Sequence, residues 1–282
     1  MNRGVLLVAN NNGSIDYILQ ACFLAKRVKK YLRLPVALVT DTPELVESTY
    51  SSYINLFDIV IKHTPTHEYT KKTYRDGAFV DKQLDFKNSS RSSVFDLTPY
   101  DETLVLDTDI LLFNDSFLTC FDQKHDLLIY KNAIDLAEAN TSKDFKFISD
   151  VGVDFYWAAC IFFRKNSKNK IFFDLVKHIQ ENWDHYRLLY QISSGVFRND
   201  FVFSIAIHIM NGFSSGEFAK EFPGRLIYAT DSSELIELTE DGVLLLLENS
   251  NRIGQYTPMN IKNTTIHFMN KFSLDRILKN DN

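Results

Sequence analysis

The chain has 282 residues, 45% of them hydrophobic and 24% charged, which suits a globular protein with a substantial buried core. Its formal net charge of −5 excludes a protein that binds polyanions through overall charge. No apolar run is long enough to cross a bilayer, and the run at residues 5–9 is too short for a signal peptide. We therefore expect a cytoplasmic protein, with Cys22, Cys120 and Cys160 as buried free thiols.

The first sixty residues alternate between strand and helix patterns. Short apolar runs at residues 5–9, 35–40 and 56–61 predict buried strands. Apolar residues recur at helical spacing over residues 15–31, after Ser14 as a candidate N-cap. This alternation is typical of βαβ units and predicts an α/β fold with a mostly parallel sheet flanked by helices.

The next segments change character several times. Residues 62–85 are polar and lack clear periodicity, which predicts a long loop or lid. We expect a helix at residues 86–97 and then a central strand that ends in Asp107-Thr108-Asp109. A short strand at residues 126–130 precedes a polar insertion that extends to about residue 150.

The second half contains longer patterns. An apolar run at residues 155–163 predicts a central strand, and amphipathic periodicity predicts one long helix at residues 169–191. A second helix is expected at residues 200–210. We further expect a turn at residues 241–242, a strand at residues 265–269, and a polar tail that frays beyond Asp275.

Asp107 and Asp109 are the first candidate metal ligands. Side chains at positions i and i+2 of an extended segment leave the backbone on the same side. The two carboxylates can therefore converge on one hard cation at the end of a buried strand, where open α/β sheets bind ligands. The alternative is a pair of solvated carboxylates in an ordinary turn.

A second set of residues suits the same chemistry. His267 in the late strand adds a nitrogen ligand, which favours Mn²⁺ over Mg²⁺. Lys271, Lys87 and Arg91 could neutralise a diphosphate. Asp200 opens a helix, where a carboxylate could contact or deprotonate an acceptor hydroxyl. Each residue also has a purely structural interpretation: a core histidine, a solvated helix face, or a charge at a helix N-terminus.

These positions together resemble a GT-A glycosyltransferase, closest to the glycogenin-like and galactosyltransferase-like family 8. The resemblance covers most of the chain. In that family the first strand, the following turn and a helix tyrosine hold the nucleotide. A basic residue and the Asp-x-Asp motif follow later in the chain. The matching positions here are residues 8–12 (with Ala9, Asn10 and Asn12), Tyr17, Arg91, Asp107, Thr108 and Asp109. The family's Asp-Gln and His…Lys signatures resemble Asn199-Asp200 and His267…Lys271.

The resemblance implies a GT-A, Rossmann-like domain that spans residues 1–282. Residues 1–115 would bind a nucleoside-diphosphate sugar, with UDP favoured and Mn²⁺ or Mg²⁺ as cofactor, and residues 116–282 would shape the acceptor site. The transferred sugar would be a hexose or a pentose. The chain departs from the family at residues 156–159, which lack an Asn-Ser-Gly motif, at Phe201, and after Lys271, where no Pro-Trp follows. The resemblance therefore does not extend to the choice of sugar or to the stereochemical outcome.

The amino-acid sequence of several segments also resembles glycosyltransferase-like proteins of large tailed phages. That resemblance implies action in the cytoplasm of an infected host cell, with a hydroxymethylated base in phage DNA as a candidate acceptor. The best surface for DNA is residues 62–91, where basic residues alternate with Tyr69, Tyr74 and Phe79. Its acidic neighbours, among them Glu68, favour a solvated loop over a DNA-binding surface.

Two other functions use a related sheet. A sugar nucleotidylyltransferase would have a Gly-rich, Arg-containing phosphate loop after the first strand, and Asn10-Asn11-Asn12-Gly13 is a poor substitute. A non-catalytic binding protein would keep the fold without turnover. Intact Asp107, Asp109 and His267 argue against the second alternative.

Overall fold

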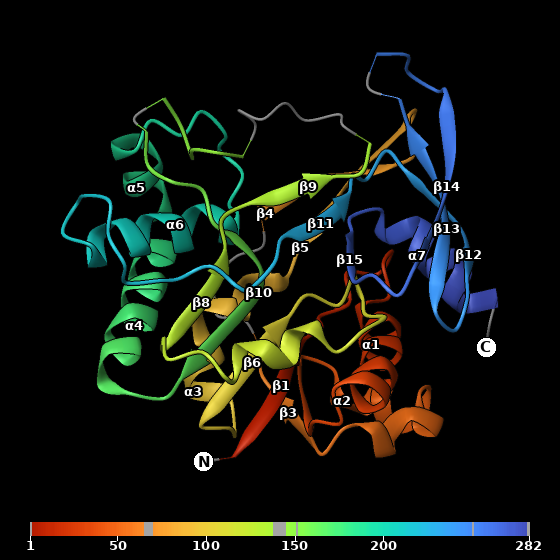
Figure 1. The fold of residues 1–282 in the computed structure, drawn as a ribbon, viewed down its shortest axis with the longest axis horizontal. Coiled ribbons are helices and arrows are strands. Elements are labelled where there is room, and N and C mark those ends of the chain that lie inside the picture. The colour runs from red at the N-terminus through yellow and green to blue at the C-terminus, as the bar shows by residue number, and fades with distance from the viewer. Residues whose placement is uncertain (1, 65–69, 138–144, 151, 250, 281–282) are drawn as a thin grey trace.

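The computed structural model describes residues 2–64, 70–137, 145–150, 152–249 and 251–280. Its centre is a six-stranded sheet with the order β3-β2-β1-β6-β10-β8 (Figure 1). The first four strands are parallel, and β10 runs antiparallel to both β6 and β8. The α/β fold with a mostly parallel sheet is therefore confirmed. The strands are β1 (Arg3–Val8), β2 (Val36–Thr40), β3 (Ile59–Lys62), β6 (Glu102–Leu106), β8 (Leu127–Tyr130) and β10 (Trp157–Arg164).

The inner strands are continuous apolar runs because both of their faces are covered. Every residue of β2 and β6 is buried, as are all residues of β1 except Arg3. Helices α1 and α2 lie on one side of the molecule in Figure 1, and α4, α5 and α6 on the other. The helical segments are α1 (Tyr17–Tyr31), α2 (Pro43–Ser48), η1 (Ser51–Leu56), η2 (Asn88–Ser93), α3 (Val94–Leu97), η3 (Ser116–Cys120), α4 (Ser167–Glu181), α5 (Trp183–Leu189) and α6 (Asn199–Met210). No helix among the described residues combines the length and the apolar character that a membrane span requires.

A second sheet ties the middle of the chain to its C-terminal part. It has the order β7-β15-β11-β9, and β15 pairs antiparallel with β7. The pairing places His267 opposite Ile110, immediately after the Asp-Thr-Asp turn. This sheet therefore joins segments that are more than 150 positions apart. Its strands are β7 (Ile110–Leu111), β9 (Ala133–Asp135), β11 (Leu226–Ala229) and β15 (Ile266–Phe268).

The C-terminal part adds a three-stranded antiparallel sheet. It consists of β12 (Glu234–Leu238), β13 (Gly242–Glu248) and β14 (Tyr256–Lys262), and the turn predicted at residues 241–242 joins the first two. The tail does not fray as predicted: α7 (Lys271–Asn280) continues to residue 280. Its Leu274 and Leu278 are buried in an apolar cluster with the three-stranded sheet and α1, which explains why the helix is stable.

The prediction of a loop at residues 62–85 was wrong for the second half of that segment. That half is a β-hairpin of β4 (Thr70–Asp76) and β5 (Val80–Phe86). The hairpin turns at Gly77, whose φ of +73° lies in the left-handed region that glycine adopts without strain. Asp76-Gly77 is a hairpin signal that the sequence contains. The helix predicted at residues 86–97 is instead two short pieces, η2 and α3.

Two helix boundaries also differ from expectation. The N-cap of α1 is Asp16 rather than Ser14, because Asp16 Oδ1 accepts a hydrogen bond from the Leu19 N–H at 3.0 Å. The predicted helix at residues 169–191 is two helices that meet at Asn182. The Asn182 side chain donates to the His178 carbonyl at 2.8 Å, and such local bonds compete with the regular helix pattern.

Candidate functional site

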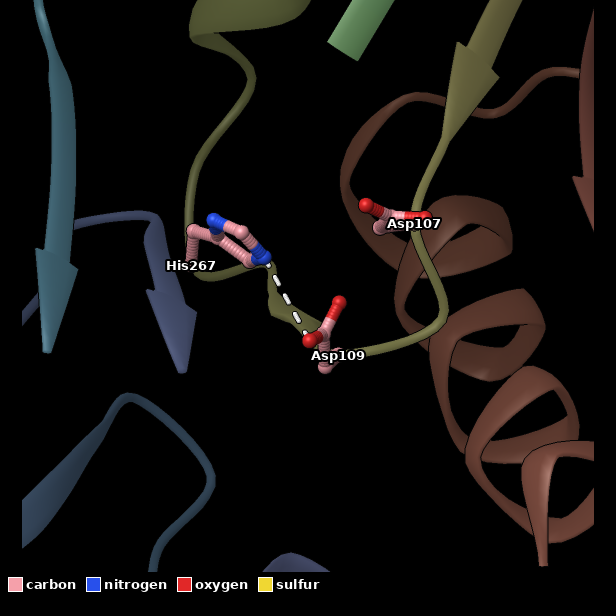
Figure 2. Close-up of side chains that lie close together, drawn as sticks. All are labelled: Asp107, Asp109 and His267. Carbon is pink, nitrogen blue, oxygen red and sulfur yellow. Dashed lines mark ion pairs between the residues drawn. The ribbon is translucent and has the colours of Figure 1, made fainter. Parts of the chain in front are cut away.

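The candidate site forms where β6 leaves the central sheet. Beyond Leu106 the chain turns through Asp107-Thr108-Asp109, and the Ile110 N–H donates to the Asp107 carbonyl at 3.1 Å. It then enters β7 beside β15, and the Phe268 N–H donates to the Asp109 carbonyl at 3.0 Å. The turn between two sheets thus brings His267 to the two aspartates, as Figure 2 shows.

Asp107, Asp109 and His267 have the arrangement of a metal site. One ligand atom from each of them lies within 4.8 Å of the others. Two ligands on opposite sides of an octahedral ion with bonds of about 2.1 Å would be about 4.2 Å apart, so only small shifts are needed. Asp109 Oδ1 and His267 Nδ1 are buried and have no hydrogen-bond partner within the described part of the chain. Because buried polar atoms without partners are costly, a cation that Asp109 Oδ1 contacts would remove one of these penalties. The residues therefore fit a divalent ion.

Two basic side chains contact Asp109 in this structure. Lys271 Nζ lies 2.5 Å from Asp109 Oδ2, and His267 Nε2 lies 3.3 Å from the same oxygen. Burial alone would raise the pKa of Asp109, but the charges of Lys271 and His267 outweigh it and hold that pKa well below its usual range. Asp109 is therefore ionised at any ordinary pH.

Arg91 plays the corresponding part for the other aspartate. Its guanidinium pairs with Asp107 and donates to the Ala158 carbonyl. The Arg91 side chain is only 3% exposed, whereas that of Asp107 is 27% exposed and faces the cavity between the two sheets. Arg91 thus pairs with Asp107, whose carboxylate stays partly exposed to the cavity.

Asp200 lies in the first turn of α6 and faces the same cavity. Its Oδ1 accepts from the Ala158 N–H at 2.9 Å, and its Oδ2 accepts from Arg198 Nη2 at 2.7 Å. Burial would raise the pKa of Asp200, but Arg198 and the Ala158 N–H lower it overall. A carboxylate with a lowered pKa is a weak proton acceptor, so it is better suited to orient a hydroxyl or to stabilise positive charge.

The cavity between these groups has a volume of about 80 Å³. Six of the residues predicted from the sequence line it: Tyr17, Arg91, Asp107, Asp200, His267 and Lys271. Asp109 lies directly behind, bonded to His267 and Lys271. The structure therefore brings the predicted metal ligands, the acceptor-side carboxylate and two of the predicted cations to one place.

Five other predicted residues lie outside this lining and make structural bonds. The Ala9 N–H donates to the Val39 carbonyl, and Asn10 Nδ2 donates to the Lys87 carbonyl at 3.1 Å. Asn12 Nδ2 donates to the Asp85 carbonyl at 3.3 Å, and Thr108 Oγ1 donates to Gln20 at 3.3 Å. Their contribution to nucleotide binding, with that of Lys87, stays a prediction.

Sequence reasoning assigned no role at this site to several residues that line it. Lys72 and Tyr74 enter from the hairpin β4–β5, and Arg198 enters just before α6. The hairpin signal at Asp76-Gly77 would have predicted strands on which Lys72 and Tyr74, at positions i and i+2, share a face. Burial, together with the nearby charges of Arg198 and Lys271, lowers the pKa of Lys72 to about 8.

The basic residues predicted to form a DNA-binding surface do not all face the same way in the structure. Lys72 and Arg91 face the site, whereas Arg75 lies 3.4 Å from Asp81 and Lys82 lies 4.0 Å from Asp76. Glu68 and Tyr69 lie outside the described residues. The remaining surface is therefore less basic than its sequence indicates.

No family model matches the sequence, and no curated protein matches it. Among solved structures, the glycosyltransferase GlyE of Streptococcus pneumoniae TIGR4 is similar at 13% identity and a TM-score of 0.46, over 78% of this chain and 45% of GlyE. The galactosyltransferase LgtC, in complex with donor and acceptor sugar analogs, is similar at 12% identity and a TM-score of 0.45, over 77% of this chain and 72% of LgtC. A 4-diphosphocytidyl-2C-methyl-D-erythritol synthase from Anaerococcus prevotii is similar at 14% identity and a TM-score of 0.38, over 78% of this chain and 86% of the synthase. The chain spans less than half the length of GlyE, and all three scores are below 0.5, so function is inferred from its own residues.

Proposed function

We propose that the chain is a metal-dependent glycosyltransferase of the GT-A type, which moves a sugar from a nucleoside-diphosphate sugar to an acceptor hydroxyl. The observation that carries the proposal is the convergence of Asp107, Asp109 and His267 beside Lys271, in a cavity that Asp200 also lines. A UDP-sugar is the favoured donor. In this proposal the chain works as one unit, with residues 1–115 on the donor side and residues 116–282 on the acceptor side.

The metal ligands would hold Mn²⁺ or Mg²⁺, which would offset the negative charge of the departing diphosphate. Lys271 is placed to assist. Once Asp109 binds a cation, the ammonium that now contacts Asp109 Oδ2 can turn to a phosphate oxygen in the cavity. Lys72 lines the same cavity and has no carboxylate within ion-pair distance among the described residues. We therefore assign Lys72 to the donor phosphates as a second cation.

On the acceptor side, the hydroxyl oxygen would bond to the anomeric carbon as the bond from that carbon to the diphosphate oxygen breaks, and the hydroxyl proton would pass to the departing diphosphate. Asp200 would face this hydroxyl or the positive charge that develops on the sugar. Arg198 and the Ala158 N–H fix the Asp200 carboxylate in place. Its lowered pKa keeps it negatively charged throughout the reaction.

The loop after β1 argues against a sugar nucleotidylyltransferase. Such an enzyme needs free backbone N–H groups there to cradle phosphates. Here Asn12 Oδ1 accepts from the N–H groups of Ser14 and Ile15, and Asn11 Oδ1 accepts from the Ile18 N–H. Three of the backbone donors that follow the first strand are therefore already used.

The acceptor class is a separate question from the donor. A hydroxymethylated base in phage DNA is the acceptor that the sequence resemblance implies, and it remains a prediction. Hydroxymethylated DNA therefore belongs in any acceptor screen, beside protein and glycan acceptors.

Metal-dependent nucleotide binding tests the proposal. We expect UDP with Mn²⁺ to raise the melting temperature, since a ligand at 100 times its Kd stabilises the native state by about 2.7 kcal/mol. EDTA should abolish the shift, and Asp109→Asn should not show it. Glu44→Gln, at an exposed ion pair that does not line the cavity, is the matched control and should shift as the wild type does. Lack of a shift with every nucleotide diphosphate and nucleotide sugar, with Mn²⁺ present, would overturn the proposal.

A further inference from the structure

A larger cavity lies behind the candidate site, between residues 152–156, the end of α5, and α6 with the turn that follows it. Its volume is about 560 Å³, within the range of about 300–1,000 Å³ typical of small-molecule pockets. Two adjacent residues face different cavities: Tyr156 lines this one, and Trp157 lines the candidate site. Asp200 and Ser204, one helical turn apart on α6, divide in the same way. We refer to it as the α6 cavity.

The α6 cavity combines aromatic surfaces with neutral polar groups. Tyr190, His208 and Phe213 form a run of edge-to-face rings whose successive centroids are 5.9 Å apart. Phe213 is 67% exposed although its φ of +61° is unfavourable for a bulky residue, so the backbone presents a large ring to solvent at a conformational cost. The polar lining residues are Ser204, Asn211, Ser214 and Ser215.

Two hydroxyl groups in this lining lack partners. Tyr156 and Tyr190 are each only 6% exposed, and neither hydroxyl has a hydrogen-bond partner among the described residues. Burial raises the pKa of both phenols, that of Tyr156 to about 12, so both remain protonated donors at neutral pH. Neither hydroxyl oxygen is fully buried, so both open onto the cavity, where a polar ligand can accept a hydrogen bond from them.

The charge of the cavity excludes a phosphorylated occupant. The described residues that line it include no lysine or arginine. Its one carboxylate, Asp154, lies 2.8 Å from Lys131, and burial lowers the pKa of His208, which keeps the imidazole neutral at pH 7. A nucleotide or a DNA backbone would therefore find no cation here, whereas a sugar can stack on the rings and bond to the hydroxyls.

We propose that the α6 cavity binds a neutral saccharide. The wall between the two spaces is rigid: the Tyr156 N–H donates to Ser204 Oγ at 2.8 Å, and Ser204 Oγ donates to the Asp200 carbonyl at 2.6 Å. A saccharide in the cavity therefore sits against the helix turn that carries Asp200.

Saturation-transfer NMR with lactose, maltose, cellobiose and N-acetyllactosamine tests the saccharide site. We expect at least one of these disaccharides to bind the wild type, and Phe213→Ala and Tyr190→Phe each to weaken that binding about tenfold. Leu188→Ala is the matched control, because Leu188 is 67% exposed on the neighbouring helix α5 but does not line the cavity. It should bind as the wild type does.

The two proposals fail in different ways. Asp109→Asn should retain disaccharide binding while it loses Mn²⁺-dependent UDP binding, and Phe213→Ala should do the reverse. If no disaccharide binds a wild-type sample that binds UDP with Mn²⁺, the saccharide site is wrong and the donor site stands. Displacement of a bound disaccharide by a hydroxymethylated DNA oligonucleotide would also overturn it, because it would place nucleic acid in a cavity assigned to a neutral sugar.

Discussion

At the scale of single residues, the site is a set of charges that compensate one another. Asp109 is ionised inside the protein because Lys271 and His267 surround it, and Asp107 is held by Arg91. Such pairs keep buried carboxylates charged and ready for a metal, and the loss of one partner leaves the other uncompensated. Two predictions follow from this charge arrangement.

Asp109→Asn should lower the free energy of unfolding by about 1–3 kcal/mol at pH 7, because Lys271 loses its carboxylate partner. The folded pKa of Asp109 is depressed, so this stabilisation is fully present above the ordinary Asp pKa of about 3.9 and is lost as pH falls below it. Urea denaturation of both proteins between pH 3 and pH 7 measures the difference. Equal stability of the two proteins at pH 7 would contradict the assigned pairing.

Lys72→Met should weaken Mn²⁺-dependent UDP binding about tenfold at pH 7, and Lys71→Met, which removes an exposed neighbouring lysine, should not. The wild type should also lose affinity as pH rises through about 8, where Lys72 gives up its proton, and Lys72→Met should lack this step. Calorimetric titration from pH 7 to pH 9 gives both quantities. The same pH profile in both proteins would remove Lys72 from the phosphate site.

At the scale of elements, the hairpin β4–β5 is the part of the site that depends most on turn chemistry. It carries Lys72 and Tyr74 to the cavity, and the Tyr17 hydroxyl donates to the Tyr74 hydroxyl at 3.3 Å. Gly77 forms its turn at φ +73°, and a Cβ there would lie 2.5 Å from Glu234 Oε1. A side chain at this position therefore meets both backbone strain and a close neighbour.

Gly77→Ala should destabilise the protein by about 1–2 kcal/mol, because a left-handed conformation is unfavourable for alanine. Gly195→Ala is the matched control: its Cβ would meet nothing within 4 Å and its φ is not positive, so its effect should stay within about 0.5 kcal/mol. Denaturant titration compares the two. A neutral Gly77→Ala would mean that the turn does not constrain the hairpin.

At the scale of the whole molecule, the site exists because two sheets meet at residues 107–110. The strands of the central sheet and the Asp-x-Asp turn could be predicted, because continuous apolar runs and i, i+2 spacing are local signals. The pairing of Ile110 with His267 is not a local signal, so the sequence alone could place His267 near the turn only through a family resemblance. Arg198 was missed for the same reason, whereas Lys72 was missed because the hairpin signal at Asp76-Gly77 was not used.

The central claim is metal-dependent transfer from a nucleoside-diphosphate sugar, and the release of UDP from a panel of UDP-sugars tests it most directly. Many transferases pass the sugar slowly to water, so the assay needs no known acceptor. We predict that at least one UDP-sugar releases UDP only when Mn²⁺ or Mg²⁺ is present, and that Asp109→Asn lowers the rate at least about a hundredfold, or about 2.7 kcal/mol in transition-state stabilisation. Release that is independent of metal, or equal in wild type and Asp109→Asn, would contradict the account.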